Sequence, residues 1–182
     1  MLLTIVLIIV SVVVVAVGVV LIVAATRPDT FGLSRSAVIN APAGKIFPHI
    51  NDFHNWAAWS PFEKLDRAMK KTFSGEPSGV GAIYEWQGNS KAGAGRMEIT
   101  ESSSPSKIVI KIDFLKPFEN HNIVEFTLAS QGESTGVTWS MHGPVPFVAK
   151  IFHLLLDMDK LIGKDFAEGL ANLKAITEKQ PQ

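Results

Sequence analysis

Three polar residues in the middle of the chain have side chains that could recognise or transform a ligand: Arg96, Glu98 and His121. Arg96 and Glu98 are two residues apart in a segment with a strand-like pattern, so they share one face of that strand. If that face points into an apolar pocket, the pair anchors a polar head group or a carboxylate; if it faces solvent, the two form a surface ion pair. His121 lies beside the strands with the clearest alternation and is the preferred acid or base candidate among the histidines.

No known catalytic, metal or cofactor motif accompanies these residues. The five histidines lack a metal-ligand spacing such as His-Glu-x-x-His, and the chain has no cysteine for a thiolate site. Asp157 and Asp159 are two apart in a helical segment, so they point to different sides. The Gly-x-Gly pairs at 79–81 and 93–95 do not continue into a dinucleotide fingerprint, and no Gly-x-Ser-x-Gly elbow occurs. We expect no cofactor, no metal and no catalytic residue, and favour binding over catalysis.

The charged residues are distributed unevenly. All 17 acidic and 17 basic residues lie at or beyond Arg27, and residues 2–25 are an apolar run broken only by Thr4, Ser11 and Gly18. As a helix this run is roughly 36 Å long, enough to cross a hydrocarbon core of about 30 Å. Residues 1–26 therefore predict a single transmembrane anchor. The alternative is a secretory signal peptide, although these normally have a positive start and a shorter apolar stretch.

Charge gives two further indications about partners and topology. Arg27 and Arg35 follow the span, which under the positive-inside rule favours a cytoplasmic domain, but Asp29 lies between them and the side stays open. The formal net charge is zero, which argues against nucleic acid as a partner, because phosphate binding requires a basic surface. We expect the bilayer to be one partner, through residues 2–25.

Behind the span, residues 27–32 are expected to form a juxtamembrane linker, residues 33–178 one domain and residues 179–182 a frayed tail. Alternation of apolar and polar residues is clearest at 107–115, as expected for a half-buried strand. The other strands are expected at 31–40, 70–74, 82–87, 95–101, 121–128 and 137–142. Two short helices are expected between the first two strands, at 43–52 and 55–60.

The chain after Pro146 has helical periodicity. Apolar residues from Ile151 to Ile176 recur at spacings of three and four, with charged residues on the opposite side. This pattern predicts one long helix from Lys150 to Thr177, which needs a long surface to pack against. A curved antiparallel sheet of six to seven strands provides that surface, so the fold class is α+β.

This order of elements resembles the START-like superfamily, also described as SRPBCC or polyketide cyclase/dehydrase and lipid transport proteins. The resemblance spans about residues 33–174 and implies a helix-grip (START/Bet v 1-like) fold. Four segments carry it: Val38-Ile39-Asn40-Ala41-Pro42-Ala43, Asp52-Phe53-His54-Asn55-Trp56-Ala57-Ala58-Trp59-Ser60-Pro61, Gly79-Val80-Gly81-Ala82 and Gly93-Ala94-Gly95-Arg96-Met97-Glu98-Ile99. It also implies a cavity between sheet and long helix that holds apolar or amphipathic molecules.

The strand and helix patterns are compatible with such a cavity. Inward apolar side chains enclose a pocket if the walls do not meet, and an ordinary core if they do. Trp56 and Trp59 are three residues apart and either plug one end of the sheet or gate a cavity mouth. The candidate lining residues are Trp59, Phe62, Tyr84, Trp86, Met97, Phe114, Phe126, Trp139, Met141, Phe152 and Leu156.

Three functions remain open at this stage. The first is a membrane-tethered binding protein for a lipid or other hydrophobic small molecule. The second is a cyclase/dehydratase-type enzyme that acts on an apolar substrate. The third is an interaction protein with a filled core that presents a surface to a membrane partner. A bound ligand separates the first two from the third, and turnover separates the second from the first.

Overall fold

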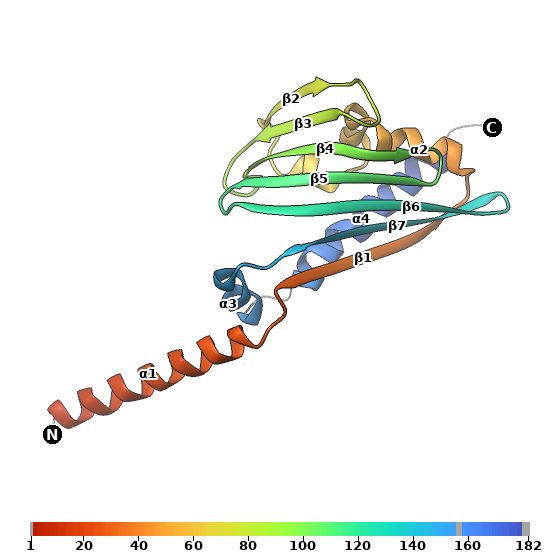
Figure 1. Cartoon of the computed structure of the whole chain (residues 1–182). Coiled ribbons are helices and arrows are strands. Elements are labelled where there is room, and N and C mark those ends of the chain that lie inside the picture. Colours follow the sequence, from red (N-terminus) through yellow and green to blue (C-terminus); the bar gives the residue numbers. More distant parts are fainter. Residues whose placement is uncertain (1, 156–157, 180–182) are drawn as a thin grey trace.

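The computed structural model describes residues 2–155 and 158–179. Figure 1 shows an apolar helix, α1 (Leu2–Ala25), that projects away from a sheet-and-helix domain. Every α1 residue is at least partly exposed except Ala24, so α1 leaves its apolar surface unburied. The helix predicted at residues 2–25 is confirmed, and it is long and apolar enough to span a membrane, as a signal sequence can also be.

The domain is built on one antiparallel sheet of seven strands in the order β1-β7-β6-β5-β4-β3-β2. The strands are β1 (Thr30–Ile39), β2 (Lys70–Gly75), β3 (Ala82–Gln87), β4 (Ala94–Ser103), β5 (Lys107–Lys116), β6 (Asn120–Gln131) and β7 (Ser134–Pro144). Strands β2 to β7 neighbour one another in chain order, and β1 pairs with β7. The predicted sheet is confirmed. Because β1 begins at Thr30, the sheet starts inside the predicted linker 27–32.

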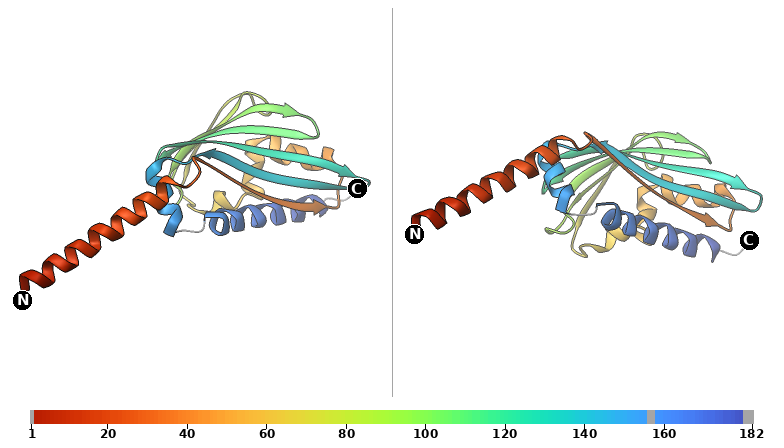
Figure 2. Two further views of the ribbon diagram at one scale, coloured as in Figure 1. Left: turned by 60° about the horizontal axis from the view of Figure 1, so that its bottom comes forward. Right: turned by 90° about the horizontal axis from the view of Figure 1, so that it is seen from below.

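One face of the sheet is apolar because side chains alternate along each strand. In β5, Ile108, Ile110 and Ile112 are buried, whereas Lys107 and Lys111 point to the other side. The sheet curves over α4 (Met158–Glu178), which lies along its inner face (Figure 2). This is the expected helix-grip arrangement. Residue 179 is the last one described, so most of the predicted tail at 179–182 lies outside the described residues.

The C-terminal segment differs from the prediction of one long helix. The structure has two helices in place of Lys150–Thr177, namely α3 (Phe147–Leu155) and α4. Helix α3 contacts α1 (Figure 1). Its Lys150 side chain is buried, and the ammonium donates to the Arg27 carbonyl at 2.8 Å and to Asp29 Oδ1 at 2.5 Å. These bonds hold α3 against the segment that joins α1 to β1, which periodicity alone did not reveal.

The two ends of the sheet are different, and we name them by their relation to α1. The proximal end is where β1 begins, and the strand register places Thr30, Pro144, Lys116, Ala94 and Gln87 there. The opposite end is the distal end. It is covered by α2 (Ala43–Asn51) and by the short helix η1 (Phe53–Ala58), which is followed by η2 (Pro61–Lys64).

The distal half of the inner face is a filled core. Trp59 is fully buried, and its indole nitrogen donates to the His49 carbonyl at 2.9 Å. Trp56 is also buried and donates to the Ile50 carbonyl at 2.9 Å, so both tryptophans fasten η1 to α2. The other large side chains in this core with almost no exposed surface are Ile39, Ile46, Ile50, Ile99, Ile108, Ile110, Phe126, Val137, Leu170 and Leu173.

Candidate functional site: an apolar cavity with buried polar groups

A cavity of about 400 Å³ lies between the inner face of the sheet, α4 and the η2 region. Strands β4 to β7 supply its roof at inward positions, where the register pairs Met97 with Ile112 and Val124 with Met141. Ile162 and Phe166 of α4 form the floor. The other lining residues are Trp56, Ser60, Phe62, Glu63, Leu65, Met69, Tyr84, Trp86, Lys91, Ala92, Phe114, Trp139 and Asp165.

Trp139 organises the cavity's aromatic wall. Its indole stacks on the Phe166 ring with centroids 3.9 Å apart, and Phe62 meets it edge-on at 6.1 Å. Helix α4 comes this close because residue 169 is a glycine: a Cβ there would lie 2.7 Å from Trp139 Cζ3. The edge-on pair is a favourable arrangement of aromatic rings, and the short, nearly parallel stack of Trp139 on Phe166 puts their faces in close contact. The wall is therefore closely packed on the side where α4 touches the sheet.

A second glycine makes room for the ring at the other side of the cavity. Trp86 on β3 lies across β4, and a Cβ at Gly95 would be 2.3 Å from Trp86 Cη2. The Trp86 indole donates to the Ala92 carbonyl at 3.0 Å, which fixes its orientation, and its ring meets Phe114 edge-on. Glycine at position 95 thus lets a large aromatic side chain form the cavity wall near the proximal end.

The acidic side chain of Glu63 is buried at the cavity edge and is fully partnered. It accepts a hydrogen bond from Tyr84 Oη at 2.7 Å, and its other oxygen forms an ion pair with Lys71. Burial, together with the hydrogen bond and charge of Glu63, raises the pKa of Tyr84 far above its ordinary value. The phenol therefore stays protonated and acts as a donor to Glu63.

Asp165 is the second carboxyl group in the wall. Burial raises its pKa, the nearby Glu168 carboxylate raises it further, and Lys164 opposes the shift. Asp165 lies on α4 three residues after Ile162 and next to Phe166, at the border of the apolar stripe. A carboxyl group held in an apolar wall with a raised pKa is a candidate acid or base.

Two buried donors in the cavity wall have no hydrogen-bond partner among the described residues. They are Ser60 Oγ and Trp139 Nε1, and both residues are almost completely buried. Polar groups in protein interiors are nearly always hydrogen-bonded, because an unpaired one costs about 1–3 kcal/mol. Both residues belong to the cavity lining, which makes the two groups candidate donors to a bound molecule.

The structure brings together seven of the eleven predicted lining residues. Phe62, Tyr84, Trp86, Met97, Phe114, Trp139 and Met141 line the cavity. Trp59 and Phe126 do not; both are fully buried in the adjoining filled core, where their rings meet edge-on at 6.1 Å. The side chain of Phe152 and the whole of Leu156 lie outside the described part of the chain.

The three predicted polar anchors are not in the cavity, and the inward alternative for them is wrong. Met97 faces the cavity, so its neighbours Arg96 and Glu98 face outward, where they form an ion pair at 2.8 Å. His121 is also on the outer face, with Nδ1 2.6 Å from Asp113 Oδ1. Burial alone would raise the Asp113 pKa, but its bonds to His121 and Lys111 outweigh this and lower it.

The polar groups that do line the cavity were not found from the sequence. Ser60, Glu63 and Lys91 lie in segments with no periodicity. Asp165 lies in a helical pattern, next to the charged residues of its polar side. For Ser60 one local signal indicates a position near the core: it directly follows the tryptophan pair and precedes Pro61. For Glu63 no local pattern indicates burial of the side chain, since that burial arises from elements distant in sequence, and Lys91 is exposed at the cavity rim.

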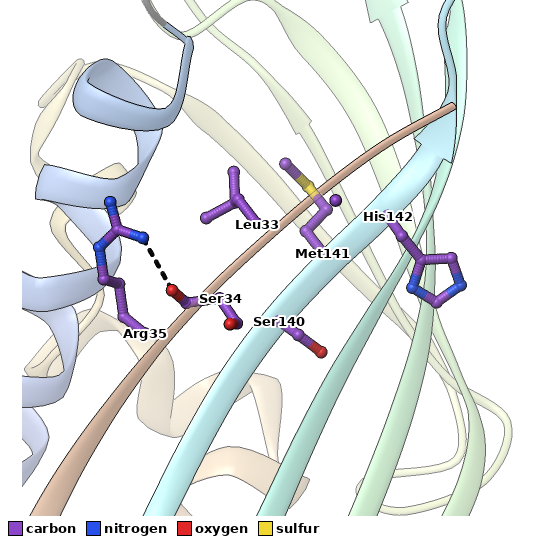
Figure 3. Close-up of a pocket in the computed structure, with 7 residues that line it drawn as sticks. Leu33, Ser34, Arg35, Ser140, Met141 and His142 are labelled. Atoms are coloured by element: carbon purple, nitrogen blue, oxygen red, sulfur yellow. Dashed lines mark hydrogen bonds between the residues drawn. The ribbon is translucent and has the colours of Figure 1, made fainter. Parts of the chain in front are cut away.

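A second hollow of about 470 Å³ lies along the edge strand β1 and its neighbour β7 (Figure 3). It is bordered by Leu33, Ser34, Arg35, Met141 and His142, among others. Arg35 Nη1 donates to the Ser34 carbonyl at 2.8 Å, and Figure 3 shows the guanidinium reaching toward α4. This hollow is open and polar, and apart from Met141 it shares no residue with the cavity. We therefore take the cavity between the sheet and α4 as the candidate site.

Among residues 2–155 and 158–179, no group of three or more His, Asp or Glu side chains is placed to hold a metal ion. The family model described as polyketide cyclase / dehydrase and lipid transport matches residues 30–178, which is the whole sheet-and-helix domain. No match to this sequence was found among curated proteins.

Solved structures share the fold at low sequence identity. The di-domain ARO/CYC protein BexL from the BE-7585A biosynthetic pathway has a TM-score of 0.63 at 15% identity, over 88% of this chain and 54% of that one. Protein CV1439 from Chromobacterium violaceum has a TM-score of 0.55 at 17% identity, over 85% of this chain and 100% of that one. Ara h 8.0201 has a TM-score of 0.55 at 11% identity, over 83% and 99%. At these identities the likeness concerns the fold alone.

Proposed function

The chain belongs to the polyketide cyclase/dehydrase and lipid transport family, and on that basis we propose that it binds a hydrophobic small molecule in the cavity under its sheet. The observation that carries the proposal is the combination of an apolar cavity with two buried, unpartnered donors, Ser60 Oγ and Trp139 Nε1. Ligand sites typically have volumes of about 300–1,000 Å³ and apolar walls with a few orienting polar groups. The cavity has all three properties.

The polar groups indicate the kind of ligand. Ser60 and Trp139 offer hydrogen-bond donors, so the ligand needs an acceptor oxygen. Among the charged lining residues, Glu63 is already paired with Lys71, and the remaining two, Asp165 and Lys91, have opposite charges. The proposed ligand is therefore an apolar molecule with an acceptor oxygen, and Arg96, which lies outside the cavity, does not contribute to its recognition.

Helix α1 supports a membrane location for this binding. Apart from Thr4 and Ser11, its exposed side chains are apolar along its length, and the bilayer is the environment that accepts such a helix at least cost. A tether of this kind raises the effective concentration of the cavity next to lipid-dissolved molecules. We propose a single-pass, membrane-tethered binding protein; the side of the membrane that the domain faces is left open.

A second candidate function, a cyclase- or dehydratase-type enzyme, has one specific observation in its favour. Asp165 is a carboxyl group with a raised pKa in the wall of an apolar cavity, which suits a general acid. Chemical change of a bound molecule that is lost in Asp165→Asn, while binding persists, would identify an enzyme. Unchanged ligand in both proteins supports the binding function.

The experiment that tests the proposal is analysis of what copurifies with the full-length chain in nanodiscs formed directly from the host membrane. Solvent extracts of the wild type are compared by mass spectrometry with those of Val124→Phe, which fills the cavity. The matched control is Val109→Phe on the outward-facing side of β5. A molecule present with the wild type and the control but absent from Val124→Phe supports the proposal. Identical extracts from all three contradict it.

A further inference from the structure

We propose that the proximal end of the domain rests on the bilayer that α1 crosses, so that the cavity opens onto lipid. The surface concerned, which we name the mouth loops, consists of residues 64–70, 88–93, 115–119 and 145–148. The inference builds on the proposed membrane anchor and adds a docking surface and an entry route. Its partner is the lipid surface itself.

The cavity lies toward the proximal end, which is the first observation behind this proposal. Leu65, Met69, Lys91, Ala92 and Phe114 line it, and each lies in a mouth loop or next to one. At the distal end the inward residues are completely buried and α2 covers them (Figure 1). The cavity therefore has its exposed rim, including Leu65 and Lys91, at the end of the sheet where α1 enters.

The second observation is the position of exposed apolar side chains. Outside α1, the structure describes eight large apolar residues that are exposed, and five of them lie in the mouth loops. These five are Leu65, Leu115, Phe118, Phe147 and Val148. Phe118 is 70% exposed and Val148 is 60% exposed. Apolar residues gathered at one end of a domain mark an interaction surface, and here that end adjoins a helix suited to lipid.

The third observation is the short connection between α1 and the sheet. Five Cα–Cα steps separate Ala25 from Thr30, and they span at most about 18 Å. The connection is also held in place, because the Val145 amide donates to the Asp29 carbonyl at 2.7 Å and Lys150 binds Arg27 and Asp29. If α1 crosses a bilayer, Phe147 and Val148 are therefore kept close to its surface.

Charge favours the same partner. The segments 27–29, 64–70, 88–93 and 115–119 contain six basic residues and three acidic ones, whereas the whole chain is neutral. Lysine and arginine side chains near a membrane surface are attracted to anionic lipid head groups, at about 1 kcal/mol each. Exposed apolar side chains flanked by basic ones are the combination found on surfaces that lie in the membrane interface.

The test uses single cysteines, which is straightforward because the natural chain contains none. Full-length Phe118→Cys, Val148→Cys and Val80→Cys are labelled with an environment-sensitive fluorophore and reconstituted, one chain per nanodisc, in lipid with an anionic component. Val80 is 55% exposed and lies near the distal end, so it is the matched control. A fourth variant, Val13→Cys, reports whether α1 is in the hydrocarbon core.

Lipids that carry a quencher near the head group should remove most of the fluorescence at positions 118 and 148 and leave position 80 almost unchanged. Equal, weak quenching at 80, 118 and 148 overturns the inference. If position 13 is then still quenched by deep quenchers, the anchor stands and only the docking surface fails; if it is not, the proposed anchor fails as well. The measurement is repeated in discs that hold two chains. If the fluorophores at 118 and 148 move into an apolar environment only in those discs, the surface belongs to a second copy, and the inference is also overturned.

Discussion

Replacing Ser60 by alanine should raise the free energy of unfolding of the ligand-free domain and, at the same time, weaken ligand binding. The Ser60 side chain is 1% exposed, and its hydroxyl has no hydrogen-bond partner among the described residues. Ser60 directly precedes η2, but its side chain makes no capping bond there, so alanine removes no helix cap. The substitution therefore removes an unsatisfied polar group and leaves the packing around Cβ in place.

The size of both effects can be worked out from these contacts. An unpaired buried polar group costs about 1–3 kcal/mol, so Ser60→Ala should raise the free energy of unfolding by about 1 kcal/mol. The hydrogen bond lost to the ligand's oxygen is worth about 0.5–1.5 kcal/mol. That loss corresponds to a roughly 2- to 13-fold rise in Kd. The two effects have opposite signs, which ordinary destabilisation does not produce.

The assay is denaturant unfolding of the domain, followed by tryptophan fluorescence, and titration with the molecule recovered from the extracts. Thr135→Val is the matched control, because its buried hydroxyl donates to the Ala41 carbonyl at 2.8 Å and lies outside the cavity lining. It should lower the free energy of unfolding by about 1–3 kcal/mol and leave Kd unchanged. If Ser60→Ala lowers stability as Thr135→Val does, or leaves Kd unchanged, the reasoning is refuted.

Three further predictions concern other groups at the cavity. Tyr84 is the only tyrosine, so phenolate absorbance reports it alone, and Glu63→Gln should lower its apparent pKa because the charge that opposes ionisation is removed. Because burial raises the pKa of Asp165, the folded state holds this proton more tightly than the unfolded chain. The free energy of unfolding should therefore fall as the pH rises from 3.8 through the folded pKa. Asp165→Asn, unfolded at several pH values, should lack this fall and be more stable than the wild type at pH 7. Gly169→Ala should cost about 1–3 kcal/mol in thermal or denaturant unfolding, because its Cβ would lie 2.7 Å from Trp139 Cζ3.

Each of these predictions has a result that contradicts it. An unchanged alkaline titration in Glu63→Gln would mean that burial alone determines the pKa of Tyr84. A pH dependence in Asp165→Asn equal to that of the wild type would mean that this carboxyl group titrates normally. Full stability of Gly169→Ala would mean that α4 moves away from Trp139 at no cost.

Most of the fold could be predicted from local patterns. Alternation in residues such as Ile108, Ile110 and Ile112 located the strands, because the side-chain period of a strand is two whatever it packs against. The long helix was predicted less well. The apolar spacing continues across Lys150, and tertiary contacts, including those of its ammonium with Arg27 and Asp29, show that α3 belongs with α1.

The candidate site was predicted in part, and the failures have a physical reason. The apolar lining follows from strand alternation, which is why Met97, Trp139 and Met141 were found. The face of the polar residues Arg96 and Glu98 stayed open, because alternation separates two faces of a strand without stating which one is concave, and a ligand cavity accepts polar groups as solvent does. Arg96 and Glu98 therefore fitted either face until the sheet's curvature was known.

By itself the sequence determined the apolar N-terminal helix, the antiparallel sheet, the helical C-terminal segment and the family resemblance, because each depends on the order and period of residues close together in the chain. Tertiary structure alone decided that the sheet and α4 leave a cavity at the proximal end and meet in a filled core at the distal end. Whether two walls touch depends on the sizes of residues far apart in sequence. Glycine at positions 95 and 169 and large rings at Trp86 and Trp139 set that distance.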